Sequence, residues 1–224
     1  MTSKHTKKSP TAKTASPPRS AQPPPRAWQR MLSGRRLDLL DPSPLDIEIE
    51  DIAHGLARVA RWNGQTLGDH ALSVAQHVLI VEEIAANRNP KWSSAWKLAT
   101  LLHDAQEYVV GDLISPFKTA IGLDYKAFEI RLNEAIHLRF GLPPSLPDEV
   151  AIEIKSADRI AAYFEATVLA GFEPSEALRF FGKPTGISPP LRSRLEKLTP
   201  LPVAEAQDLF LHRFALLSKH PASR

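Results

Sequence analysis

The sequence predicts an all-α protein: one helical domain, residues 28–220, that follows a tail over residues 1–27. Three observations predict this class. Apolar residues recur at spacings of three and four in several long segments, as on the buried face of a helix. No segment shows the apolar–polar alternation of a half-buried strand. Gly or Pro follows most of the periodic segments, where helices commonly end.

The predicted helices follow one another along the domain. They span residues 49–62, 69–86, 92–109, 125–140, 148–170 and about 203–217. Glu50 and Asp51 open the first helix, where acidic side chains suit the positive end of the helix dipole. A glycine directly follows two of the others, at Gly141 and Gly171. Residues 171–201 hold five prolines, so we expect this segment to run over the surface with short helical pieces.

The net charge of +3 belongs to the tail rather than to the domain. Residues 1–27 contain six basic residues, six prolines and no Asp or Glu, so the rest of the chain carries a charge of about −3. A segment with so few apolar side chains is expected to be disordered. The alternative role of the tail is a weak electrostatic affinity for polyanions. We expect no specific nucleic-acid partner.

The composition excludes several classes of protein. The chain has no run of the roughly 18 to 20 apolar residues that a membrane helix needs, and no apolar segment follows the first basic residues as in a secretory signal. It has no cysteine, which excludes disulfides, thiolate metal ligands and cysteine nucleophiles. We therefore expect a cytoplasmic protein without a membrane partner, in which nitrogen and oxygen atoms hold any bound metal.

Four metal-type side chains stand where the predicted helices should be buried. His77 lies among apolar neighbours in the second helix, and Asp158 borders the core stripe of the fifth. His103 and Asp104 follow an apolar run in the third. Each of them alone is more often a hydrogen-bonded core residue than a ligand, because a buried polar group must find a partner. Together they predict a site for one divalent ion (Co, Mn, Zn, Fe, Ni or Mg) whose shell water completes.

The ordered pattern His, His-Asp, Asp is the signature of the HD superfamily of metal-dependent phosphohydrolases, which the chain resembles over about residues 45–170. Residues 103–118 are similar to the H-D-x-x-E-x(3)-G-D-x(3)-P-x-K run of bacterial 5′-deoxynucleotidases. Residues 73–77 and 155–158 resemble the segments around the first and last ligands of that group, and Arg61-Trp62 matches its R-W pair. Residues 64–68 are closer to short phage-type HD hydrolases, some of which act on dATP.

The resemblance implies an HD-type helical bundle that removes phosphate from (deoxy)nucleoside 5′-monophosphates. It makes the four metal-type residues ligands of the ion. Glu107, one turn after His103 in the predicted helix, would orient or deprotonate the attacking water; the alternative is a hydrogen-bond partner of a liganding histidine. The implied substrate contacts are Arg61 with the phosphate, Trp62 with the sugar or base, Asp112 with a sugar hydroxyl and Lys118 with the phosphate.

Three other functions remain open. A dNTP triphosphohydrolase would use the same metal site with more cations nearby, for which His54, Arg58 and Lys118 are candidates. A dinuclear cyclic-nucleotide phosphodiesterase needs further histidines between the His-Asp pair and the last aspartate, where only His137 lies. A nucleotide-sensing module without catalysis would be expected to lack a ligand or Glu107. We expect a small-molecule nucleotide substrate and a homo-oligomer, a dimer or larger.

Overall fold

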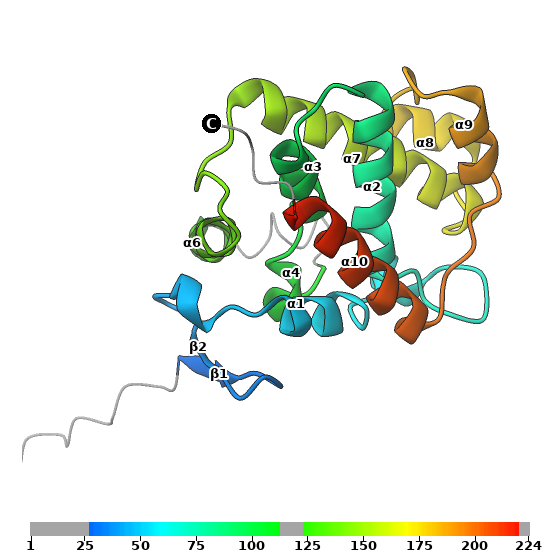
Figure 1. Cartoon of the computed structure of the whole chain (residues 1–224). Helices are drawn as coiled ribbons and strands as arrows, with labels where there is room; N and C mark the ends of the chain where they lie inside the picture. Colours follow the sequence, from blue (N-terminus) through cyan, green and yellow to red (C-terminus); the bar gives the residue numbers. More distant parts are fainter. Residues whose placement is uncertain (1–26, 113–122, 220–224) are drawn as a thin grey trace, which may run out of the picture.

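Two long helices, α2 (Val74–Arg88) and α7 (Asp148–Val168), pack side by side at the centre of the structure (Figure 1). The structure is a computed structural model that describes residues 27–112 and 123–219, so the predicted tail lies outside the described residues except for its last one. The hydroxyl of Ser73 caps the start of α2 by accepting a hydrogen bond of 3.2 Å from the Gln76 amide. Helix α7 begins at Asp148, directly after Pro147.

The remaining helices surround this pair. They are α1 (Ile49–Leu56), α3 (Ser94–Leu101), α4 (Glu107–Val110), α6 (Leu123–Arg139), α8 (Pro174–Phe181), α9 (Pro189–Leu195) and α10 (Val203–Ser218), with 3₁₀ turns η1 (Pro44–Asp46) and η2 (Arg61–Gly64). Helix α10, red in Figure 1, contacts α1, α2 and α3. Helices α8 and α9 lie to the right of α2 in Figure 1, and α8 packs on α7. The predicted all-α class is confirmed.

A small hairpin precedes the helices, and the prediction that the sequence forms no strand is wrong there. Strands β1 (Trp28–Arg30) and β2 (Arg36–Asp38) pair antiparallel, with Gln29 opposite Leu37. The turn between them contains Gly34 at φ 86°, a conformation that glycine adopts without a steric penalty. Strands of three residues are too short to show the alternation over four to eight residues by which strands are recognised.

The buried apolar side chains form two clusters, and α2 contributes to both. The larger cluster contains residues from α1, α2, α3, α6, α7 and α10. The smaller one lies between α2, α7 and α9. Residues 171–201 form the expected short helical pieces, α8 and α9. The expectation that this segment runs over the surface is wrong for Leu191, Leu195 and Leu198, which are buried in the smaller cluster.

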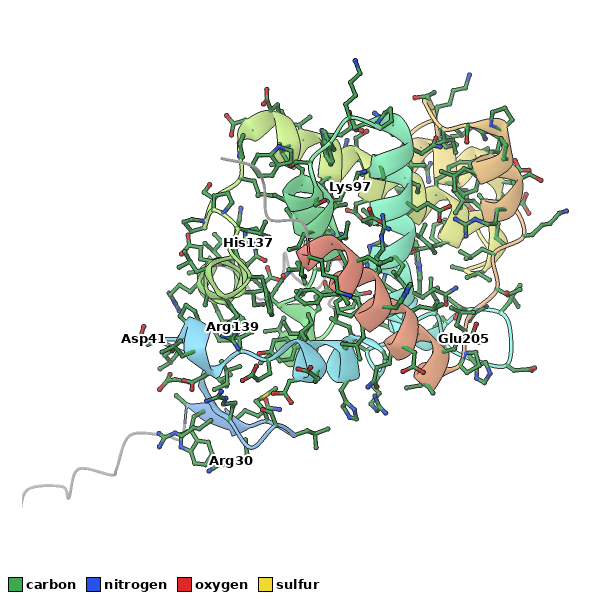
Figure 2. The ribbon with its side chains drawn as sticks, in the orientation of Figure 1. Arg30, Asp41, Lys97, His137, Arg139 and Glu205 are labelled. Carbon is green, nitrogen blue, oxygen red and sulfur yellow. The ribbon has the colours of Figure 1, made fainter. Side chains whose placement is uncertain are left out.

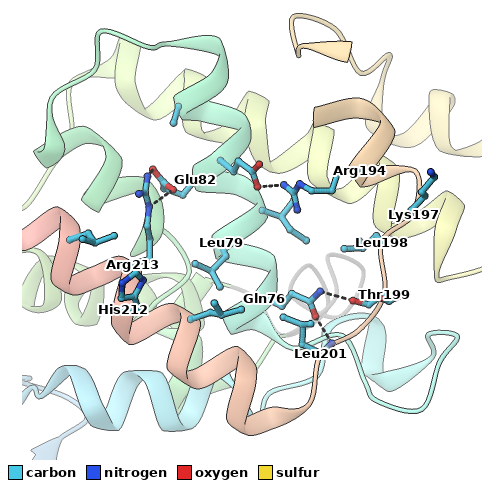
Figure 3. Close-up of a pocket in the computed structure, with 15 residues that line it drawn as sticks. Gln76, Leu79, Glu82, Arg194, Lys197, Leu198, Thr199, Leu201, His212 and Arg213 are labelled. Carbon is cyan, nitrogen blue, oxygen red and sulfur yellow. Dashed lines mark hydrogen bonds and ion pairs between the residues drawn. The ribbon is translucent and has the colours of Figure 1, made fainter. Parts of the chain in front are cut away.

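The segment between α9 and α10 is held against α2 by one side chain. The Gln76 amide group donates to the carbonyl oxygen of Thr199 at 2.8 Å, and its oxygen accepts from the Leu201 amide at 2.9 Å (Figure 3). One turn and a half further along α2, Glu82 is buried and bound by Arg213 of α10. These contacts fix the helix that carries His77 to the C-terminal part of the fold.

Helix α6 is anchored to the N-terminal half by Arg139, labelled in Figure 2. Its Nε donates to the Ile47 carbonyl at 2.8 Å, and its Nη2 contacts Glu48 at 2.9 Å. His137 on the same helix is buried, with Nδ1 3.0 Å from the Pro143 carbonyl oxygen, so it is a structural residue of this corner. Within the described ranges, no helix combines the length and the apolar character needed to cross a membrane.

Candidate metal centre

The helix predicted over residues 92–109 is interrupted in the middle, and the interruption carries His103 and Asp104. Helix α3 ends at Leu101, and residues 102–106 form turns before α4 begins at Glu107. The turns close through short-range hydrogen bonds, from the His103 amide to the Thr100 carbonyl at 3.3 Å and from the Glu107 amide to the Asp104 carbonyl at 3.0 Å. The prediction that His103 and Glu107 lie one turn apart in a continuous helix is therefore wrong.

The four predicted ligands nevertheless converge from three parts of the fold. His77 comes from α2 and Asp158 from α7, while His103 and Asp104 come from the turn after α3. The Nε2 atom of His77 lies 3.5 Å from Asp104 Oδ2 and 3.4 Å from Asp158 Oδ1. His103 Nε2 lies 3.3 Å from the same Asp104 oxygen. Ligand atoms of His77, His103 and Asp158 all lie within 4.8 Å of one another, a spacing at which they can hold one metal ion.

The hydrogen bonds of the two histidines fit metal binding. His103 Nδ1 lies 2.8 Å from the Thr100 carbonyl oxygen, which can only accept, so Nδ1 carries the proton. His77 Nδ1 lies 2.5 Å from a carboxylate oxygen of Glu165. Both Nε2 atoms are buried and have no hydrogen-bond partner among the residues that the structure describes. A neutral imidazole with a protonated Nδ1 offers the Nε2 lone pair, which is the usual arrangement of a liganding histidine.

The two aspartates are held in the ionised form that binds cations. Burial raises the pKa of Asp104, but His103 and His77 outweigh it, and the pKa falls well below its usual value. For Asp158 burial again raises the pKa, but the proximity of His77 at 3.4 Å outweighs it, so that the pKa is below normal. Lys155 contacts the outer oxygen of Asp158, Oδ2, at 2.6 Å and leaves Oδ1 directed toward His77. The set of two nitrogens and two carboxylates suits a divalent ion such as Zn, Mn or Co.

The sequence predicted that Arg61 and Trp62 end the first helix, and this prediction is wrong. Helix α1 stops at Leu56, and the pair lies in the turn η2, where the Arg61 amide donates to the Leu72 carbonyl at 2.8 Å. Trp62 has φ 55° and ψ 29°, the left-handed region that a bulky side chain rarely occupies. The indole packs edge-on against Phe172 and Phe181, at ring distances of 5.6 and 5.8 Å.

Glu165 of α7 is the site residue that sequence reasoning missed. Its side chain is fully buried and contacts His77, Arg61 and Trp62. Burial raises the pKa of Glu165, but its contacts with His77, Arg61 and Trp62 outweigh it and lower the pKa to about 2. The signal in the sequence was its position: Glu165 follows Asp158 by seven residues, two helical turns, and stands between Phe164 and Ala166.

The structure places the remaining candidate residues in different surroundings. Asp112 Oδ2 lies 3.2 Å from Arg61 Nη1, so these two predicted substrate contacts are brought together. Glu107 is buried at the start of α4. Arg58, a candidate cation of the triphosphohydrolase alternative, donates to Gln207 of α10 at 2.9 Å. Lys118 lies outside the described residues.

Comparisons with known proteins show that the chain is similar in sequence to two uncharacterized bacterial proteins. No protein-family model matches it. An uncharacterized protein of Rhodobacter capsulatus is 56% identical over 193 residues, which cover 86% of this chain and 97% of that protein. The uncharacterized protein YfdR of Escherichia coli is 29% identical over 174 residues, which cover 78% of this chain and 86% of that protein.

One solved structure that aligns with the chain is the cyanophage S-2L HD phosphohydrolase (DatZ), bound to dA and one catalytic Zn²⁺ ion. It aligns with a TM-score of 0.45 and 17% identity, over 77% of this chain and 97% of that chain. Within the chain itself, the His, His-Asp and Asp residues of the sequence motif converge in one place. The chain thus carries the HD signature and, at 56% identity over nearly the whole relative, belongs to the same family as the Rhodobacter capsulatus protein.

Proposed function

We propose that the chain is a metal-dependent phosphohydrolase that removes phosphate from (deoxy)nucleoside 5′-monophosphates. The observation that supports it most is the pair of buried Nε2 atoms, on His77 and His103, that lie 3.5 and 3.3 Å from Asp104 Oδ2 and lack hydrogen-bond partners within residues 27–112 and 123–219. Buried polar atoms in folded proteins nearly always have a partner, so such a pair indicates that a group is bound there. Together with the HD motif, it supports a site in which an ion assists hydrolysis.

His77, His103, Asp104 and Asp158 would hold the ion. When bound, a divalent ion neutralises charge on the phosphoryl oxygens and makes water a better nucleophile. The protein has to supply the rest: a fixed position for the nucleotide, a group that orients the attacking water, and a proton for the leaving oxygen.

Arg61 is suited to bind the phosphate group. Its side chain is 13% exposed, with Nη1 and Nη2 against Asp112 and Glu165, while its Nε is buried and has no hydrogen-bond partner in the described part of the chain. A guanidinium held by two carboxylates is pre-oriented and still has a donor to offer to a phosphate oxygen. In this proposal Trp62 contacts the sugar or base, Asp112 a sugar hydroxyl, and Lys118 the phosphate.

In this proposal Glu107 orients or deprotonates the attacking water. Glu107 begins α4 directly after the turns over residues 102–106 that carry His103 and Asp104, and its side chain is buried. A buried glutamate next to a metal site can accept a proton from water and return it to the leaving group. We retain it as the candidate general base.

A nucleotide panel tests the proposed function. The metal-loaded protein is incubated with ribo- and deoxynucleoside mono- and triphosphates, and released phosphate and triphosphate are measured separately. The proposal predicts phosphate from monophosphates and no release by the Asp104→Ala variant. Triphosphate released from dNTPs would replace it with a triphosphohydrolase on the same site. No release from any nucleotide would contradict hydrolysis and indicate a nucleotide-sensing protein.

A further inference from the structure

The carboxylate of Glu165 connects the candidate metal site with the candidate nucleotide site. Its two oxygens contact different groups: Oε1 lies 2.5 Å from His77 Nδ1, while Oε2 accepts from Trp62 Nε1 at 2.9 Å and from Arg61 Nη2 at 3.2 Å. The side chains of Glu165 and His77 are both 0% exposed. A carboxylate enclosed in this way keeps its orientation because each of its contacts restrains the others.

An ordinary buried ion pair would not need the backbone found here. Trp62 and the following Asn63 both have positive φ, at 55° and 51°, although neither is a glycine. Such strained residues persist only where the surrounding structure holds them, and they occur often at binding sites. The turn brings the indole N–H of Trp62 onto Glu165, so the strained conformation and the buried carboxylate are parts of one arrangement.

We propose that Glu165 is a positioning residue with two tasks. It holds His77 as the tautomer with a protonated Nδ1, so that Nε2 points at the metal ion, and it ties the Arg61-Trp62 turn to that histidine. The inference rests on the proposed function, because it takes the ion bound by His77 and the nucleotide bound by Arg61 as given. A carboxylate behind a liganding histidine raises the basicity of the ligand and fixes its ring.

The arrangement makes metal binding and nucleotide binding interdependent. A nucleotide that draws Arg61 toward its phosphate changes the charge next to Glu165, and Glu165 passes the change to His77 through a single hydrogen bond. Coupling between two sites is reciprocal in binding free energy, so the ion must strengthen nucleotide binding by the factor by which the nucleotide strengthens ion binding.

Metal affinity of the Glu165→Gln variant tests the first task without any turnover. Glutamine keeps the size of the side chain and loses its charge, and we expect the affinity for Zn²⁺ or Co²⁺, measured by competition with a chelator, to fall about 10- to 100-fold. The matched control is Glu82→Gln, which removes another buried glutamate that pairs with an arginine, on the helix of His77 but away from the ion site. It should keep the affinity of the unmodified protein.

A spectroscopic signature and a second variant separate positioning from general destabilisation. The 2.5 Å bond predicts a strongly downfield Nδ1 proton for His77 in the NMR spectrum, retained in Glu82→Gln and shifted upfield in Glu165→Gln. Trp62→Phe removes the indole donor and keeps the ring packing, and we expect it to lower metal affinity by less than Glu165→Gln does. Unchanged affinity in Trp62→Phe would overturn the tie between the turn and the ion.

The outcomes distinguish this inference from the proposed function. An unmodified protein that binds the metal, with a Glu165→Gln variant of equal affinity and an unshifted Nδ1 proton, would overturn the role of Glu165 alone. An unmodified protein that binds no metal would contradict the proposed function and this inference together. Should Glu165→Gln fail to fold, Glu165→Asp takes its place: it keeps the charge on a shorter side chain, and we expect its metal affinity to fall as well.

Discussion

At the scale of single residues, the candidate centre depends on which nitrogen of each histidine is engaged in a hydrogen bond, because the other nitrogen is then left for the metal ion. His103 uses the Thr100 carbonyl, only three residues away in sequence, whereas His77 uses a carboxylate on another helix. Local hydrogen bonding therefore orients the first ring and tertiary structure orients the second. Changes in α7 should for this reason affect His77 more than His103.

Glu107 can be separated from the ligands by experiment. If it acts on the attacking water, Glu107→Gln should keep the metal and still bind nucleotide, while turnover falls by about 10² to 10⁴ fold, the usual contribution of a general acid–base. Metal content and steady-state turnover measured on the same preparation test this directly. Glu149→Gln, an exposed position on α7, serves as the control and should leave both unchanged.

The alternative role of Glu107 gives a different pattern. A side chain that only orients a liganding histidine would lower metal affinity by about 10 to 100 fold when it is changed. Near-normal turnover in Glu107→Gln would exclude both roles.

The residues of the site differ in how far sequence can predict them. The candidate ligands could be predicted as a group because a motif with fixed order combines His77, His103-Asp104 and Asp158, and the structure brings them together. Glu165 could not, because its neighbours in space are 88 and more residues away in sequence. A buried charge on an apolar helix face signals that a partner exists, but it does not say which one.

At the scale of elements, the helices were predictable and their interruptions were not. Periodicity predicted α2, α7 and α10 to within a few residues at most ends. It merged α3 with α4, because the apolar side chains continue across the turns over residues 102–106. It likewise extended α1 to residue 62, although that helix ends at Leu56. Both interruptions place site residues, and both are stabilised by contacts that a periodic pattern does not contain.

The packing of α1 on α4 depends on Gly55. A β-carbon at this position would lie 2.7 Å from Cβ of Tyr108 and 3.1 Å from its backbone oxygen. Alanine favours a helix over glycine by about 1 kcal/mol, but forcing a group into a filled space costs about 1–3 kcal/mol and here meets backbone. We expect Gly55→Ala to lower the free energy of unfolding, measured with urea, and to lower turnover by displacing Glu107.

The control for Gly55→Ala is Asp208→Ala, at an exposed position in the middle of α10. It gains helix propensity without a clash, and its stability should stay equal or rise. If Gly55→Ala were as stable as Asp208→Ala, the close contact between α1 and α4 would be wrong.

At the scale of the whole molecule, the site is formed where α2, α7 and the end of α3 meet, and the rest of the chain holds these three in place. Residues beyond 170 complete both apolar clusters, through Leu191 and Leu195 in one and Phe210 in the other. The sequence motif covers about residues 45–170 and does not reveal this contribution. The similarity to the Rhodobacter capsulatus protein extends over 86% of the chain, well beyond the motif.

Elemental analysis tests whether the chain binds one divalent ion through the four converging side chains. The unmodified protein, purified and incubated with Mn²⁺ or Co²⁺, should carry about one ion per chain, because its donors match a single divalent site. His103→Ala and Asp104→Ala should carry none, while His70→Ala, an exposed histidine away from the cluster, should keep the ion. An unmodified protein that holds no metal after this incubation would contradict the assignment of these four side chains as a metal site.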